Sequence, residues 1–152
     1  MMKQGDDMRI IVDGDGCPVI DITIEIAKYY GLEIIIVKDY SHDLWDEYAT
    51  IVTVDEGHDS VDLHIVNNVK KKDIVVTQDY GLAAMALTKG AICITQNGKV
   101  ISSNNVDNLL ARRHFNQQIR KKYKHYPKIK KRSPEQDSFF KENLKKLIEE
   151  IA

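Results

Sequence analysis

The chain has 152 residues, of which 43% are hydrophobic and 30% charged, and its formal net charge is −1. This length and composition are typical of one globular domain, and the lack of an apolar run of about 18 residues excludes a membrane span. With two cysteines and no Cys-rich zinc pattern, we expect a cytoplasmic protein without a membrane partner. The charge is uneven, because residues 112–152 hold 13 Lys and Arg against 5 Asp and Glu, whereas residues 1–111 hold 9 against 18.

Residues 10–18, Ile-Ile-Val-Asp-Gly-Asp-Gly-Cys-Pro, predict a buried strand that ends at two aspartates and turns into a helix. Asp13 and Asp15 then lie at the carboxyl end of the strand, the edge at which open α/β sheets bind ligands. Gly14 and Gly16 permit the turn and leave room for a close ligand. Two aspartates at this spacing favour a metal or phosphate site, although either could instead cap the helix or form the turn.

Strand and helix patterns alternate along the chain, which is typical of a mostly parallel sheet covered by helices on both faces. Strands are expected at residues 8–13, 33–38, 50–54, 73–77, 91–95 and 99–101, the last one antiparallel after a tight turn at Asn97-Gly98. Helices are expected from Pro18 to Gly31, over 60–69 and 79–89, and from about 105 to 122 after a cap at Ser103 or Asn104. The predicted fold is an α/β single domain over residues 1–152 with three layers and a flexible N-terminus at residues 1–7.

The last part of the chain departs from this alternation. Eight of the thirteen residues 120–132 are Lys or Arg, and we call residues 120–133 the basic segment. Ser133-Pro134-Glu135-Gln136 is typical of a capping box and predicts a C-terminal helix over residues 134–152. One face of this helix carries Phe140, Leu144, Leu147 and Ile151, and must dock on the sheet or on a partner.

Further acids follow the third and fourth predicted strands. If these strands neighbour the first, their carboxylates converge with Asp13 and Asp15, and divalent cations would offset the repulsion. Hard oxygen ligands without a Cys or His pair favour Mg²⁺ or Mn²⁺, which can activate water for phosphodiester hydrolysis. The predicted metal ligands are Asp13, Asp15, Asp59, Asp62 and Asp79, and the predicted catalytic acids are Asp13, Asp15, Asp62 and Asp79. Asp59 and Asp79 could alternatively serve only as helix caps.

The cations in the C-terminal part suit a polyanion, which an acidic pocket alone would repel. Tyr123 and Tyr126 lie within the basic segment and could stack on unpaired bases. The predicted nucleic-acid contacts, with RNA as the expected partner, are Arg112, Arg113, Arg120, Lys121, Lys128, Lys130, Lys131 and Arg132. The alternatives are a solvated linker for the segment and a solvated helix face for the arginines beside His114.

Three stretches resemble the signature blocks of the bacterial YaiI/YqxD family: residues 12–19 (Val-Asp-Gly-Asp-Gly-Cys-Pro-Val), 56–62 (Glu-Gly-His-Asp-Ser-Val-Asp) and 73–83 (Asp-Ile-Val-Val-Thr-Gln-Asp-Tyr-Gly-Leu-Ala). That family is functionally uncharacterised, and its fold is assigned to the PIN-domain-like group, many members of which are Mg²⁺- or Mn²⁺-dependent ribonucleases. The resemblance therefore implies a PIN-like α/β fold and, by analogy, nuclease chemistry. It places Asp13 at the first PIN acid, Asp62 at the second and Asp79 at a later one.

Three functions of different classes follow. The leading one is a metal-dependent nuclease acting on RNA. The second is a haloacid-dehalogenase-like phosphatase, because Asp-x-Asp after a strand also suits an aspartyl nucleophile; that family has Thr or Val where Cys17 stands. The third is a non-catalytic RNA-binding or assembly module, and a second copy of the chain is a further candidate partner.

Overall fold

The computed structural model describes residues 8–40, 43–55, 60–123 and 131–151, so the predicted flexible N-terminus lies outside them. The described residues form β1 (Arg9–Asp13), α1 (Ile20–Tyr30), β2 (Glu33–Asp39), β3 (Thr50–Val54), α2 (Ser60–Asn68), β4 (Ile74–Val76), α3 (Tyr80–Thr88), β5 (Ile92–Ile94), β6 (Val100–Ile101), α4 (Val106–Tyr123) and α5 (Pro134–Ile151). Among these helices, none combines the length and the apolarity that a membrane crossing needs.

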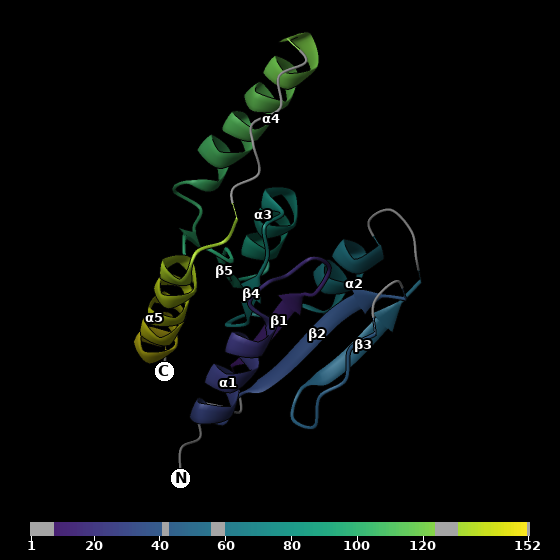
Figure 1. Cartoon of the computed structure of the whole chain (residues 1–152), viewed down its shortest axis with the longest axis vertical. Coiled ribbons are helices and arrows are strands. Elements are labelled where there is room, and N and C mark those ends of the chain that lie inside the picture. Colours follow the sequence, from purple (N-terminus) through teal and green to yellow (C-terminus); the bar gives the residue numbers. More distant parts are fainter. Residues whose placement is uncertain (1–7, 41–42, 56–59, 124–130, 152) are drawn as a thin grey trace.

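The strands form one sheet in the order β3-β2-β1-β4-β5-β6, parallel except for the pairing of β5 with β6 (Figure 1). The predicted α/β class and the antiparallel last strand are confirmed, and Gly98 takes a φ of 87° in the turn between them. The condition for convergence of the acids, that the third and fourth strands both neighbour the first, holds only for β4, because β2 separates β3 from β1. The physical reason is burial: β1 is apolar and buried on both faces, as a central strand must be, whereas β3 is only half-buried.

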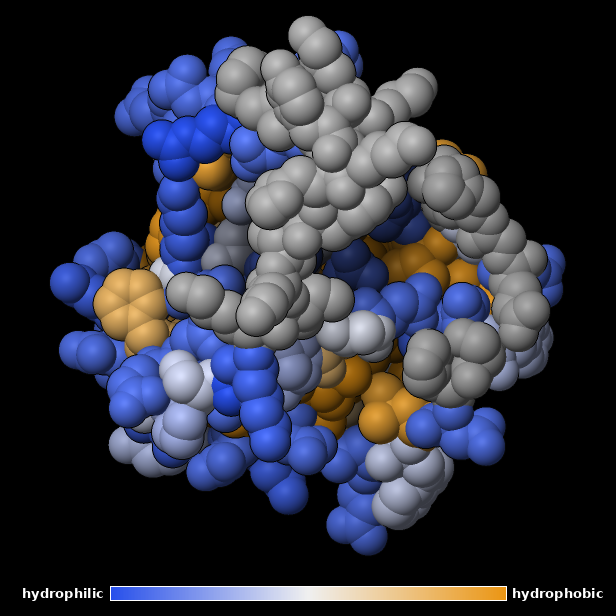
Figure 2. All heavy atoms as spheres, turned by 45° about the horizontal axis from the view of Figure 1, so that its top comes forward, coloured by the Kyte–Doolittle hydropathy of each residue, from blue (hydrophilic) through white to orange (hydrophobic). Residues whose placement is uncertain are grey.

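Alternate side chains of the sheet enter two separate hydrophobic cores. Ile10 and Val12 of β1 pack under α1 and α5, whereas Ile11 faces the core formed with α2, α3 and α4. The molecule therefore has three layers, as predicted, with helices on both faces of the sheet. Hydrophilic residues dominate the described surface in the view of Figure 2, and hydrophobic ones show mainly in the hollows between them.

Local turn and cap signals account for the helix ends. Gly31 ends α1 with a φ of 67°, as predicted, whereas the helix begins at Ile20, after Val19, so Pro18 precedes its first turn. The start of α4 at Val106 agrees with the predicted start near residue 105, but the residue immediately before the helix is Asn105 and not the predicted cap, Ser103 or Asn104. Asn105 Oδ1 accepts a hydrogen bond from the backbone N–H of Ser102 at 2.9 Å.

The predicted capping box of α5 is confirmed. The backbone N–H of Ser133 donates to Gln136 Oε1 at 2.9 Å, and the backbone N–H of Gln136 donates to Ser133 Oγ at 3.4 Å. The apolar face of the helix docks on the chain's own core, because Phe140 and Leu144 are fully buried there with side chains of the sheet and α1. This docking brings the start of α5 back to the β5–β6 turn.

Candidate active site

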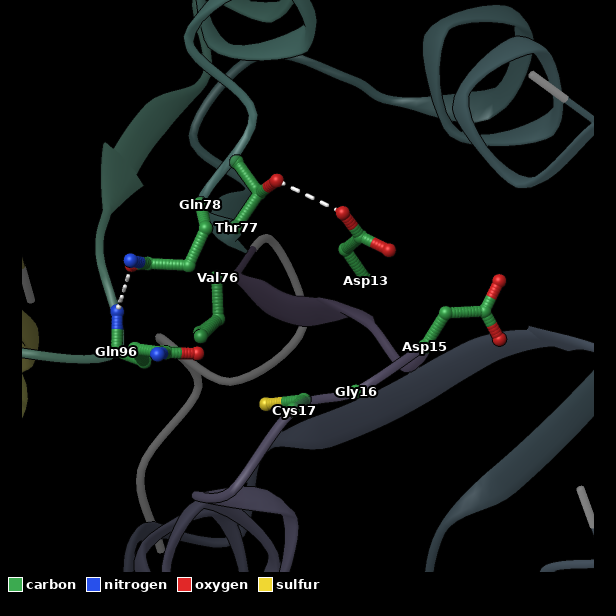
Figure 3. A pocket seen from close by; sticks show the side chains of 8 residues that line it. All are labelled: Asp13, Asp15, Gly16, Cys17, Val76, Thr77, Gln78 and Gln96. Atoms are coloured by element: carbon green, nitrogen blue, oxygen red, sulfur yellow. Dashed lines mark hydrogen bonds between the residues drawn. The ribbon is translucent and has the colours of Figure 1, made fainter. Parts of the chain in front are cut away.

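A cavity of about 190 Å³ opens at the carboxyl ends of β1 and β4 (Figure 3). Its lining consists of Asp13, Asp15, Gly16, Cys17, Val76, Thr77, Gln78 and Gln96. The chain runs from β1 to β2 on one side, and β4 lies on the other side of β1, so the cavity marks the point where the strand order reverses. Ligands of open α/β sheets bind in the crevice at this point, which makes the cavity the main candidate site.

Asp13 is the central acid of the cavity. Burial raises the pKa of its carboxyl, and the charges of Asp15 and Asp79 raise it further. The Thr77 hydroxyl opposes this by donating to Asp13 Oδ2 at 2.9 Å, and the same hydroxyl accepts the backbone N–H of Asp79 at 3.0 Å. Thr77 therefore orients the Asp13 carboxylate and links it to the start of α3. A carboxyl group with a pKa raised by burial and like charges, in a cleft, is typical of a functional site.

Asp15 lies on the side of the cavity opposite Gln96, with its carboxylate exposed (Figure 3). Asp15 Oδ1 accepts the backbone N–H of Asp39 at 3.3 Å, which ties the turn after β1 to the end of β2. Gly14 is needed for the same approach, since an added Cβ would lie 2.9 Å from Ile36 Cγ2. The absence of a side chain at Gly14 therefore serves packing, whereas Gly16, with a φ of 66°, lines the cavity.

Asp79 is the N-cap of α3, one of its two predicted roles. Asp79 Oδ1 accepts the backbone N–H groups of Gly81 at 2.9 Å and of Leu82 at 3.1 Å. The capping carboxylate also lies close enough to the cavity for its charge to raise the pKa of Asp13. The cap role and the electrostatic role thus coexist in one side chain.

The structure does not place Asp62 in the lining of the cavity. Asp62 is half-buried in the first turn of α2, the helix that follows the edge strand β3, and Asp59 lies outside the described residues. Among the described residues, no three His, Cys, Asp or Glu side chains gather as ligands for one ion. The acids that are brought together are Asp13, Asp15 and Asp79.

Three polar residues of the cavity, Thr77, Gln78 and Gln96, are not among the predicted site residues. Gln78 Oε1 accepts the backbone N–H of Gln96 at 2.8 Å, so the ends of β4 and β5 are joined beside the cavity. A signal for the first two was present, because they directly follow a predicted strand on the same edge as Asp13. The pairing of β1 with β4, which brings Thr77 to Asp13, has no signature in the local sequence.

The predicted nucleic-acid contacts have different surroundings. Figure 1 shows α4 extending beyond the sheet, and Arg112 on this helix is exposed. Lys131 is also exposed, whereas Arg132 donates to Asp137 Oδ1 at 2.6 Å, to Asn97 Oδ1 at 2.9 Å and to the Gln96 carbonyl at 2.6 Å. Three further predicted contacts belong to α4 by their backbone, but their side chains are outside the described part of the structure: Arg113, Arg120 and Lys121. Lys128 and Lys130 lie outside the described residues.

Residues 11–150 match the family described as "Uncharacterized BCR, YaiI/YqxD family". The UPF0178 protein of Alkaliphilus oremlandii is 50% identical over 143 residues, which cover 94% of this chain and 92% of that protein. The UPF0178 protein of Natranaerobius thermophilus is 50% identical over 141 residues, covering 93% and 96%, and that of Exiguobacterium sibiricum is 43% identical over 143 residues, covering 94% and 98%. No solved structure is significantly similar to the chain. The chain therefore belongs to the YaiI/YqxD family, as its three signature stretches predict.

Proposed function

We propose that this protein is a divalent-metal-dependent nuclease that hydrolyses phosphodiester bonds of RNA. The observation that carries the proposal is the cavity at the reversal point of the sheet, with Asp13 and Asp15 in its lining. Carboxylates that repel each other lower the stability of the folded protein. A cation bound between them at the ligand-binding edge of the sheet would offset this repulsion.

The donors at the cavity suit Mg²⁺ or Mn²⁺. Both ions prefer hard oxygen ligands, and Mg²⁺ is commonly held by one or two carboxylates together with substrate phosphates and water. Asp13 and Asp15 would hold the ion, and Asp79 would add negative charge nearby. Zn²⁺ is less suited to the site, because the described lining holds one cysteine, Cys17, and no histidine. When bound, the ion would polarise the phosphodiester and activate a water molecule.

The residues of the chain supply orientation and a proton acceptor. Hydrogen bonds from the Thr77 hydroxyl and from the backbone of Asp15 fix the direction of the Asp13 carboxylate. So oriented, the Asp13 carboxylate can accept a proton from a water in the cavity. Thr77 is thus a positioning residue for Asp13.

The position of Arg132 favours a polymeric substrate over a small phosphomonoester. Arg132 is bound to the carbonyl of Gln96, a residue of the cavity wall, and its charge lowers the pKa of the Cys17 thiol. The C-terminal end of the basic segment therefore lies beside the cavity. A positive surface next to an acidic pocket draws in a polyanion that the pocket alone would repel.

A cleavage assay with Mn²⁺ on single-stranded RNA, single-stranded DNA and a phosphomonoester tests the proposal. We expect cleavage of RNA that EDTA abolishes and that Asp13→Asn lowers by about 10²–10⁴-fold. Asp107→Asn, an exposed acid on α4, is the matched control and should cleave like the wild type. Hydrolysis of the phosphomonoester alone would indicate the phosphatase, and RNA binding without any cleavage would indicate the non-catalytic module.

A further inference from the structure

The cavity has two chemically different walls. Asp13 and Asp15 form an acidic wall, and Gln78 and Gln96 lie on the other side, where their side chains carry neutral amides (Figure 3). Among the described lining residues, there is no Lys or Arg. Charge is therefore concentrated on one wall, and the opposite wall offers hydrogen-bond donors and acceptors without charge.

Both backbone groups of Gln96 are hydrogen-bonded. Its N–H donates to Gln78 Oε1 at 2.8 Å, and its carbonyl accepts from Arg132 Nη2 at 2.6 Å. The guanidinium of Arg132 is itself anchored on Asp137 and Asn97. With both backbone groups bound, the Gln96 side chain extends from an anchored point after β5 into the cavity (Figure 3).

We propose that the side-chain amide of Gln96 hydrogen-bonds to the base of the RNA nucleotide bound in the cavity. This inference rests on RNA being the substrate. A primary amide places one donor beside one acceptor, and the edges of an unpaired base offer a complementary acceptor and donor. The half-buried Cys17 adds an apolar surface to the same cavity, against which a base can lie.

The size of the cavity supports recognition of one splayed base. About 190 Å³ is less than the roughly 300–1,000 Å³ of sites for drug-sized ligands, so the cavity suits a single group of a nucleotide. Proteins read RNA sequence mainly on unpaired bases that are splayed out and hydrogen-bonded along their edges. The phosphate would then lie toward Asp13 and Asp15, and the base toward Gln96.

Binding of a short fluorescent RNA and of a ribose-phosphate oligomer of the same length without bases, measured by anisotropy at fixed salt with Ca²⁺ in place of Mn²⁺, tests the inference. A gel of each sample checks that the oligomers stay intact. Gln96→Ala should weaken RNA binding by roughly 5- to 150-fold and leave the affinity for the oligomer without bases unchanged. Gln117→Ala, an exposed glutamine on α4, is the matched control and should bind both oligomers like the wild type.

RNA affinity that is unchanged in Gln96→Ala would overturn the inference, and so would an equal loss of affinity for the oligomer without bases. The nuclease proposal fails separately. A loss confined to the oligomer with bases, without RNA cleavage by the wild type in Mn²⁺, would refute the nuclease and leave the base contact standing. RNA cleavage by the wild type together with unchanged RNA affinity of Gln96→Ala would refute the base contact alone.

Discussion

Asp13 is the residue at which the proposed function and folding stability oppose each other. Burial and the charges of Asp15 and Asp79 raise its pKa from the usual value of 3.8, so the native state binds a proton more tightly than the unfolded chain does. Protonated Asp13 therefore contributes its whole share to the free energy of unfolding below about pH 3.8. This contribution is lost as the pH rises through the raised pKa of Asp13 in the native state. At neutral pH the ionised carboxylate destabilises the metal-free protein.

We predict that Asp13→Asn raises the urea midpoint of the protein in EDTA at neutral pH, because an asparagine oxygen can still accept from Thr77 without the charge. The gain should shrink as the pH falls toward 4. Mn²⁺ should stabilise the wild type by mass action but not the variant. A variant that is less stable at neutral pH and binds Mn²⁺ like the wild type would show that Asp13 only forms the turn.

Both thiols should be unreactive in the folded protein. Burial raises the pKa of Cys17 and raises that of Cys93 to about 12, so neither forms much thiolate near neutral pH. We expect slow labelling by iodoacetamide in the native state and rapid labelling in guanidinium chloride. Cys17→Ala should retain RNA cleavage nearly unchanged, and complete loss of activity in a folded Cys17→Ala protein would instead favour thiol chemistry.

At the scale of elements, one arginine joins three segments beside the cavity. Arg132 links the end of the basic segment to the β5–β6 turn and to the first part of α5 through Asp137. A second contact comes from α5, where Asn143 Nδ2 donates to the Gly98 carbonyl at 2.9 Å. Docking of α5 thus fixes the wall that carries Gln96.

We predict that Arg132→Gln lowers the free energy of unfolding by roughly 1.5–3 kcal/mol, the range for hydrogen bonds to charged groups. Its neighbour Lys131 is exposed, so Lys131→Gln should stay within about 0.5 kcal/mol of the wild type. Urea denaturation of both variants measures the difference. Equal stabilities would mean that the guanidinium contacts contribute nothing measurable and that Arg132 does not hold the turn.

At the scale of the whole molecule, charge is divided between an acidic body and a basic C-terminal part. The acidic cavity lies on the body, and Lys131 and Arg132 bring the end of the basic segment next to its wall. The guanidinium of Arg132 is already hydrogen-bonded within the protein. The lysines that precede it are therefore the better candidates for phosphate contacts. The salt dependence of RNA affinity separates such contacts from a solvated linker.

We predict that replacing Lys128, Lys130 and Lys131 with Gln flattens the slope of log affinity against log salt by about two units on single-stranded RNA, at about 0.7 per phosphate. A control with Lys71, Lys72 and Lys146 replaced removes three exposed lysines elsewhere and should keep the slope. Mn²⁺ affinity should not change in either protein. The same slope in both triple variants would leave the segment as a linker.

The sequence by itself determined most of the elements, because strand burial, turns and caps depend on neighbouring residues. The run Ile10–Val12 is buried, Gly31 ends α1, Gly98 forms the β5–β6 turn, and Ser133 with Gln136 caps α5, all as predicted. The same local logic placed Asp13, Asp15 and Asp79 at one edge. The three signature stretches likewise predicted the family to which the chain belongs.

Only the tertiary structure decided which strand ends meet, because strand order depends on packing between distant segments. It put β3 at the edge of the sheet, with Asp62 outside the cavity lining, and β4 beside β1, which joins Thr77 to Asp13. It also joined Arg132 to the Gln96 carbonyl and to Asp137, contacts that form only once α5 docks on the core.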